Sequence, residues 1–147
     1  MPYAAIEDLR ERFGDQEIDE LLDRDGDGEA DAGVADAVLA DASAEIDALL
    51  ASRYATPVAD APLLNAICCD LARYRLYDNV APEIVKERKK YSVEMLKSIG
   101  KGVGELLDSN GAPVADRQDD GQAGGATFKQ PRERIFSDAG LKGYMGP

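Results

Sequence analysis

Hydrophobic residues recur at helical spacing along most of the chain, in segments separated by glycine, proline and acidic turns. This pattern predicts five helices, over residues 4–13, 15–22, 32–54, 63–79 and 82–99. Gly14 is placed to end the first of them, and Pro62 and Pro82 are placed to begin the fourth and fifth. The pattern therefore predicts an all-α fold.

The predicted helices differ in how much of their surface is apolar. The fourth is apolar over the widest arc, so we expect it to be the central and most buried one. Its second half mixes arginine and tyrosine, from Arg73 to Tyr77, and we expect the arginine stems to pack over the core while the tyrosine hydroxyls reach water. The buried face of the fifth helix is expected to carry Ile84, Tyr91, Met95 and Ile99.

The character of the chain changes after the fifth predicted helix. A run of glycines begins at Gly100 and breaks the helical pattern. Residues 108–127 are then rich in Asp, Gly, Ala, Ser and Gln, a composition typical of flexible segments. We therefore expect a helical domain over residues 1–107, a flexible linker over 108–127 and a C-terminal docking tail over 128–147.

Apolar and basic side chains return together in the predicted tail. From residue 127 onward there are four basic and two acidic residues, whereas the rest of the chain has 13 basic and 27 acidic residues, a net charge of −14. So short a segment cannot form its own core, and the residues leave two partners open: a groove on another chain, or its own domain. The residues expected to contact a partner are Phe128, Arg132, Arg134, Ile135, Phe136, Leu141 and Tyr144.

An acidic loop between the second and third predicted helices carries the strongest chemical signal. Its D-x-D-x-D-G spacing is that of a calcium loop, where side-chain oxygens at positions 1, 3 and 5 precede a glycine and a backbone carbonyl. The candidate ligands are Asp23, Asp25, Asp27, Glu29 and Asp31. Position 12 of a calcium loop is a bidentate Glu, but this chain has Val34 there.

Three interpretations of this loop stay open. It can be a tight turn in which Asp31 caps the next helix, a structural site for Ca²⁺ or another divalent ion, or a regulatory calcium sensor. A sensor needs the bidentate Glu and usually a paired loop, and the chain has no second loop of this kind. Five carboxylates within nine residues repel one another unless a cation or solvent relieves them, which keeps the ion in consideration. We expect no cofactor to be required.

Composition narrows the possible functions. The 147 residues include no His, which removes the commonest general base and the commonest zinc ligand. The adjacent cysteines, Cys68 and Cys69, point in different directions on a helix, so we expect buried thiols and no disulfide between them. These features predict that the chain is not an enzyme.

Charge and hydropathy argue against further classes of protein. A net charge of −12 opposes binding to nucleic acid through its phosphates. The basic run Lys86–Lys90 lies on an amphipathic helix, where a solvated face or a subunit contact is favoured over a phosphate-binding patch. No apolar run approaches the ~18 residues that span a membrane, and the first residues lack the basic start of a signal peptide. We therefore expect synthesis in a cytoplasm.

Several short motifs follow one another in a distinctive order. They are Arg-Phe-Gly (12–14), Leu-Leu-Asp-Arg-Asp-Gly-Asp-Gly (21–28), Leu-Ala-Asp-Ala-Ser-Ala-Glu-Ile-Asp (39–47), Arg-Tyr-Ala-Thr-Pro-Val (53–58), Asp-Leu-Ala-Arg-Tyr-Arg-Leu-Tyr (70–77) and Arg-Ile-Phe-Ser (134–137). In this order and spacing they resemble the Mu-type bacteriophage neck proteins, small helical head–tail connectors of tailed phages. The resemblance covers residues 3 to about 100 well and the tail more loosely.

The resemblance implies a structural role in the virion. Connectors of this type form rings, commonly dodecamers, beneath the portal at the capsid vertex, where packaged DNA is retained and the tail attaches. The implied fold is a compact bundle of four to five helices with an extended, flexible C-terminal tail. The implied location is the virion neck, after synthesis in the cytoplasm of the bacterial host.

The resemblance also implies a set of partners. They are the portal protein, neighbouring copies in the ring, and a tail or stopper (terminator) protein, with the C-terminal extension engaging the portal or an adjacent copy. DNA would pass through the channel without specific binding. Two rivals come from other classes: a calcium-binding helical regulatory module, and a nucleic-acid-binding regulator that uses residues 86–90.

Overall fold

The computed structural model describes residues 2–78 and 80–117. In this part of the chain the regular elements are five α-helices: α1 (Ile6–Phe13), α2 (Asp15–Leu22), α3 (Val34–Leu50), α4 (Pro62–Leu76) and α5 (Glu83–Gly100). The all-α prediction is confirmed, and the bounds of α2 are those predicted from the sequence. None of the helices in the described ranges is both long and apolar enough to cross a membrane.

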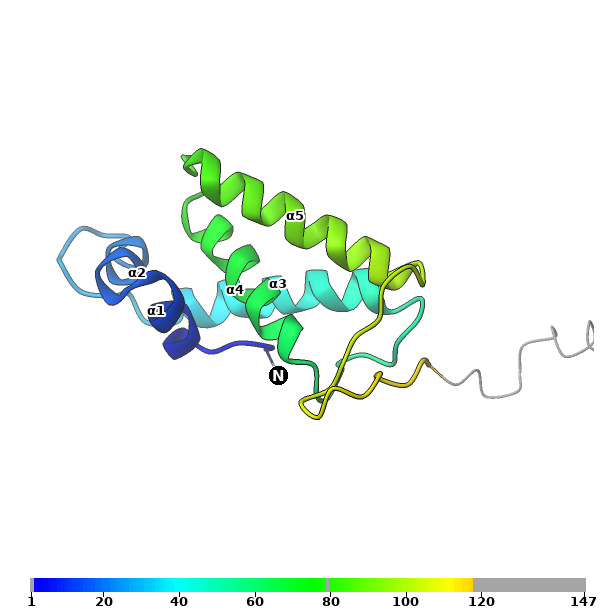
Figure 1. Ribbon diagram of the computed structural model, residues 1–147. Coiled ribbons are helices and arrows are strands. Elements are labelled where there is room, and N and C mark those ends of the chain that lie inside the picture. The colour runs from blue at the N-terminus through cyan, green and yellow to red at the C-terminus, as the bar shows by residue number, and fades with distance from the viewer. Residues whose placement is uncertain (1, 79, 118–147) are drawn as a thin grey trace, which may run out of the picture. The chain divides into compact units, whose positions relative to one another are not determined.

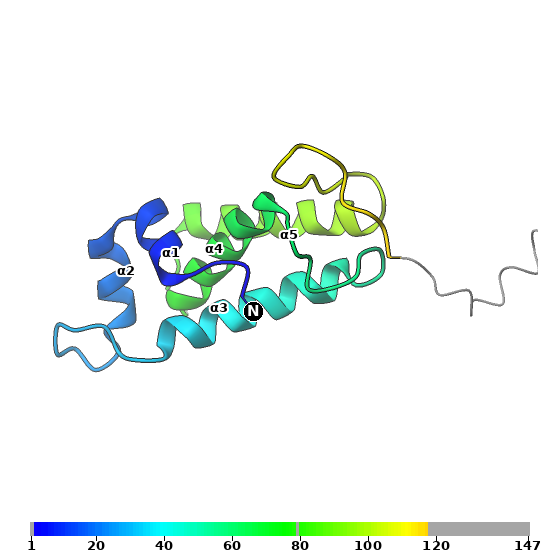
Figure 2. The same cartoon turned by 90° about the horizontal axis from the view of Figure 1, so that it is seen from below.

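The helices form a bundle with α4 at its centre. Helix α4 packs against α3, α5 and α1, while α1 and α2 pack against each other across Gly14. Figures 1 and 2 show α1 and α2 at one end of the bundle, with α3, α4 and α5 making up its body. The prediction that the fourth helix is the central one is confirmed. Its buried residues are Leu64, Ile67, Cys68, Cys69, Leu71, Ala72 and Leu76.

Aliphatic side chains make up most of the core. Ala42 of α3 and Ala72 of α4 are fully buried, and their small side chains suit close packing of helices. Both cysteines are buried as well. Burial raises the pKa of the Cys68 thiol and raises that of Cys69 to about 12, so both thiols are protonated at neutral pH.

The buried face of α5 differs from the prediction. Ile84 and Tyr91 are 58% and 65% exposed, so the expectation that they face the core is wrong. The residues that α5 buries are Val85, Ser92, Leu96 and Ile99. Ser92 joins this otherwise apolar stripe because its hydroxyl donates a hydrogen bond to Asp70 Oδ2 of α4 at 3.1 Å. The spacing of apolar residues alone could not indicate this buried face, because one of its members is a polar residue whose partner lies on another helix.

The end of α5 depends on a glycine for a reason other than helix breaking. Gly100 is the last residue of α5, and a Cβ atom built there would lie 2.5 Å from the backbone oxygen of Leu49 in α3. The absence of a side chain therefore lets the two helices approach each other closely at this point.

Residues 104–117, the C-terminal strap, pack on the domain. Leu106 is fully buried, and Val114 donates a backbone hydrogen bond to its carbonyl at 2.8 Å. Leu107 and Pro113 form an antiparallel bridge. The compact unit that contains the helices extends to Arg117, ten residues beyond the predicted boundary at residue 107, and the strap buries apolar residues on the helices. The rest of the predicted linker, 118–127, and the predicted tail, 128–147, lie outside the described residues.

Candidate functional site

The acidic loop joins α2 to α3 at the end of the bundle that holds α1 and α2 (Figure 1). Asp23 organises it: Oδ1 accepts a hydrogen bond from Gly26 N at 2.8 Å, and Oδ2 accepts one from Gly28 N at 2.9 Å. Gly26 and Gly28 have φ of +80° and +89°, which favour glycine. These backbone hydrogen bonds, that from Gly28 first, hold the pKa of Asp23 below its ordinary value.

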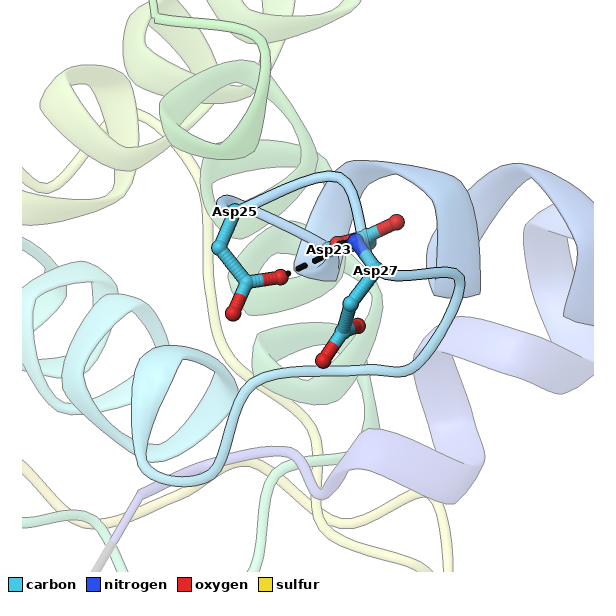
Figure 3. A group of neighbouring side chains, drawn as sticks. All are labelled: Asp23, Asp25 and Asp27. Atoms are coloured by element: carbon cyan, nitrogen blue, oxygen red, sulfur yellow. Dashed lines mark hydrogen bonds between the residues drawn. The ribbon is translucent and has the colours of Figure 1, made fainter.

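Three carboxylates of the loop lie close together (Figure 3). Asp23, Asp25 and Asp27 each offer one oxygen within 4.8 Å of the other two. Asp25 and Asp27 are exposed, and each also accepts a backbone hydrogen bond within the loop, from Asp27 N at 3.1 Å and from Glu29 N at 2.8 Å. Ionised oxygens at this spacing repel one another, and a hard divalent cation is the kind of ligand that relieves this repulsion.

The other two predicted ligand carboxylates are not part of this cluster. Asp31 Oδ2 instead accepts a hydrogen bond from Arg24 N at 2.7 Å, and Asp31 N donates to Leu22 O at 3.0 Å. Asp31 therefore closes the loop onto its own beginning. The interpretation that Asp31 caps the next helix is wrong, because Gly33, with φ of +82°, occupies the N-cap position of α3.

Arg24 attaches the acidic loop to the end of α4. Its Nη1 lies 2.8 Å from Asp78 Oδ2, and its Nη2 donates to Leu76 O at 3.3 Å. The guanidinium is thus bound at the end of α4, and it does not neutralise the three clustered carboxylates.

A second network holds α2 against α4. Arg73 donates from Nε and Nη2 to the two carboxylate oxygens of Glu17, and Tyr77 Oη donates to Glu17 Oε1 at 2.7 Å. The Arg73 guanidinium also lies 4.3 Å from the centre of the Phe13 ring. Burial raises the pKa of Glu17, but the hydrogen bonds from Arg73 and Tyr77 outweigh burial and lower it overall. The Tyr77 hydroxyl, which the sequence pattern predicts to reach water, thus has an acceptor within the protein.

Arg53, just beyond α3, ties the strap to the bundle. Its Nη1 donates to Ile99 O at 2.9 Å and also to Gly104 O, and its Nε donates to Asp116 Oδ1 at 2.9 Å. Its backbone oxygen accepts a hydrogen bond from Arg117 N at 2.6 Å. The pattern had placed Arg53 inside a longer helix, but α3 ends at Leu50.

Sequence reasoning missed this role of Arg53, although it had singled out the Arg-Tyr-Ala-Thr-Pro-Val motif that begins with this residue. The residues predicted to bind a partner, from Phe128 to Tyr144, lie beyond the strap and outside the described residues.

The basic run on α5 is divided between two environments. Arg88 Nη1 lies 3.7 Å from Asp70 Oδ1, and Lys89 Nζ lies 4.9 Å from the centre of the Tyr74 ring, both on α4. Lys86 and Lys90 are exposed. Two of these four cations thus contact α4, an arrangement that does not present a continuous row of cations to a phosphate backbone.

Comparison with known proteins identifies the family. The model of the family described as Bacteriophage Mu, Gp36 matches residues 3–123, a range that includes all five helices and the strap. "Gene product J" of Escherichia phage Mu is 35% identical over 104 residues, which cover 69% of this chain and 74% of that protein. The chain therefore belongs to the Bacteriophage Mu, Gp36 family, which supports its classification as a phage virion protein.

Proposed function

We propose that this chain is a head–tail connector, a structural adaptor that forms a ring between the portal and the tail of a tailed bacteriophage. The observation that carries the proposal is the family match over residues 3–123, which takes in the whole described domain. All but the last of the motifs that resemble Mu-type neck proteins lie inside that range. The proposed role is structural, with no reaction assigned to it.

The geometry suits a subunit that keeps its shape in an assembly. The Glu17–Arg73 pair holds α2 against α4, and Arg53 holds the strap against the ends of α3 and α5. Both networks join segments far apart in the sequence, so they restrain the domain at its two ends. We infer that the domain enters the ring as a rigid body.

The charge of the chain suits a channel through which DNA passes. Residues 1–126 carry a net charge of −14, and a ring of such subunits would repel the phosphate backbone. DNA would then move through the channel without being retained by its wall. The partners in this proposal are the portal protein, neighbouring copies in a dodecameric ring, and a tail or stopper protein, all at the virion neck.

The proposal is tested by reconstitution with the portal protein of the same phage. Purified protein is mixed with portal rings, and complexes are separated by sedimentation and imaged by negative-stain electron microscopy. A connector adds a second ring of density to one end of the portal. Portal rings that remain bare at every protein concentration would contradict the role, and a portal from an unrelated phage serves as the control.

We further propose that Asp23, Asp25 and Asp27 hold Ca²⁺ or another divalent ion as a local structural element. The supporting observation is that an oxygen from each of the three lies within 4.8 Å of the others. A calcium-driven movement of α3 is not part of the proposal, because Val34 stands where the bidentate Glu of a sensor would be.

A further inference from the structure

Two adjoining hollows form a groove on the surface of the domain. The first, of about 460 Å³, is lined by Pro2, Tyr3 and residues 57–62. The second, of about 370 Å³, is lined by Pro62, Leu63, Glu105, Leu107 and the turn that starts at Asp108. Because Pro62 lines both, the two hollows adjoin at this residue, and together they are called the groove. Each is within the range of about 300–1,000 Å³ that is usual for binding pockets.

The walls of this groove are tied together by hydrogen bonds. Asp60 Oδ2 accepts hydrogen bonds from Ser109 Oγ at 2.7 Å and from Ser109 N at 3.1 Å, which join the strap to the turn before α4. On the other side, Val58 N donates to Tyr3 Oη at 2.9 Å. The groove is therefore formed within the single chain, and these hydrogen bonds hold its lining residues in place.

The groove exposes apolar side chains to solvent. Leu63 is 36% exposed and Leu107 47% exposed, and both line the second hollow. Pro2, Pro57 and Pro62 add further apolar surface. Removal of such surface from water is the main source of favourable free energy in protein association, so this groove is suited to an apolar occupant.

The charges around the groove select the kind of occupant. Asp60, Glu105 and Asp108 line the two hollows, and among the described residues no Lys or Arg lines them, although Arg53 Nη2 lies 3.9 Å from Glu105 Oε1 at the edge. An occupant should therefore combine apolar anchors with basic flanking residues. Residues 128–136 have this composition: two Phe and one Ile stand among one Lys, two Arg and one Glu.

We propose that the groove of one copy binds residues 128–136 of a second copy. The inference rests on the proposed function, in which copies meet in a ring. The resemblance left two partners for the tail, the portal and an adjacent copy, and the inference selects the adjacent copy. Phe128 and Phe136 are the anchors for the hollows, and Arg132 and Arg134 face the three carboxylates. Because groove and tail are different surfaces, the contact is heterologous, the type that closes into rings.

The test places a photo-crosslinker, p-benzoylphenylalanine, at Phe136 in the full chain. Unlabelled crosslinker protein is mixed at high concentration with ¹⁵N-labelled protein, irradiated, and mapped by mass spectrometry. The expected result is crosslinks between labelled and unlabelled copies at residues 57–63 and 105–111. Crosslinks confined to single copies, crosslinks to another surface, or their absence would overturn the proposal.

Substitutions in the groove test whether the crosslinks depend on its residues. Leu63→Asp and Leu107→Asp in the labelled copy should remove most of the crosslinks between copies. Val80→Asp is the matched control, because Val80 is 82% exposed and lines neither hollow. Glu105→Gln, which removes an exposed rim charge without placing a cation beside Arg53, should lower the yield at low salt and less at high salt. Unchanged yields in all three groove variants would overturn the assignment.

The outcome also separates this inference from the connector role. Groove crosslinks from a protein whose loss leaves phage particles intact would support the self-association and remove the connector role. A confirmed connector whose crosslinks map elsewhere would remove only the groove.

Discussion

Arg73 of α4 donates two hydrogen bonds to Glu17 of α2, from Nε to Oε1 at 2.7 Å and from Nη2 to Oε2 at 3.0 Å. The side chains of Arg73 and Glu17 are only 14% and 27% exposed. A two-pronged pair with this burial restrains the angle and the position of α2 on the central helix. The acidic loop follows directly after α2, which ends at Leu22, so the position of α2 on α4 also fixes the point in space from which the loop starts.

Glu17→Ala should lower the free energy of unfolding by about 1.5–3 kcal/mol, because Arg73 and Tyr77 both lose their acceptor. The matched control is Asp19→Ala on the same helix. Its partner Arg10 is 34% exposed and Asp19 itself 47%, so the loss there should stay below about 1 kcal/mol. Urea denaturation measures both, and equal losses in the two variants would contradict the special role of Glu17.

Acid should selectively weaken the same contact. The pKa of Glu17 in the folded protein lies below its ordinary value of 4.5, so the folded state binds fewer protons here than the unfolded state. The stability from this carboxylate is complete above that ordinary value and is lost as pH falls through the folded pKa. The difference in unfolding free energy between the natural chain and Glu17→Gln should therefore be constant above about pH 5 and shrink as the pH falls further. A difference that stays constant would show that the charge of Glu17 is not responsible.

Helix positions could be predicted from the sequence because they depend on local spacing. The breaks at Gly14 and before Pro62 mark real helix ends. The face that α5 buries could not be predicted in the same way. Two stripes one residue apart compete on that helix, and the buried one includes the polar Ser92, whose hydrogen-bond partner Asp70 lies on another helix.

The candidate sites also differ in whether they depend on neighbours in the sequence or on packing between distant segments. The cluster of Asp23, Asp25 and Asp27 was predictable, since its members are neighbours in sequence and the glycines between them dictate the turn. The contacts of Arg53 were not, because two of its acceptors, Gly104 and Asp116, come from a segment that reads as glycine-rich and polar. Only packing brings that segment back to the end of α3.

Arg53→Ala should release the strap while the bundle stays folded. The variant removes hydrogen bonds to Ile99, Gly104 and Asp116, all within or next to the strap. Amide hydrogen exchange should accelerate at Leu106 and Val114, which are bonded within the strap and to Tyr54, and change little in α1.

Ser52→Ala provides the comparison for Arg53, because Ser52 makes one exposed contact, at 3.4 Å, with Gly100 O. Its exchange pattern should match that of the natural chain. Strap protection that survives in Arg53→Ala would show that apolar packing alone holds residues 104–117.

Calcium should raise the melting temperature of the natural chain at millimolar concentration if the three-aspartate cluster binds an ion. The double change Asp25→Asn and Asp27→Asn keeps the oxygens that accept backbone hydrogen bonds and removes two charges, so it should abolish the shift. Glu29→Gln, outside the cluster, should keep it. No shift in the natural chain at millimolar calcium would leave the loop as a turn stabilised by its own backbone.

The connector role is tested most directly by electron microscopy of a phage lysate in which only the gene for this chain carries a stop codon. The account predicts filled or emptied heads without tails, together with separate free tails, and normal particles once the intact gene is supplied in trans. Joined particles of normal appearance in the absence of this protein would contradict the account.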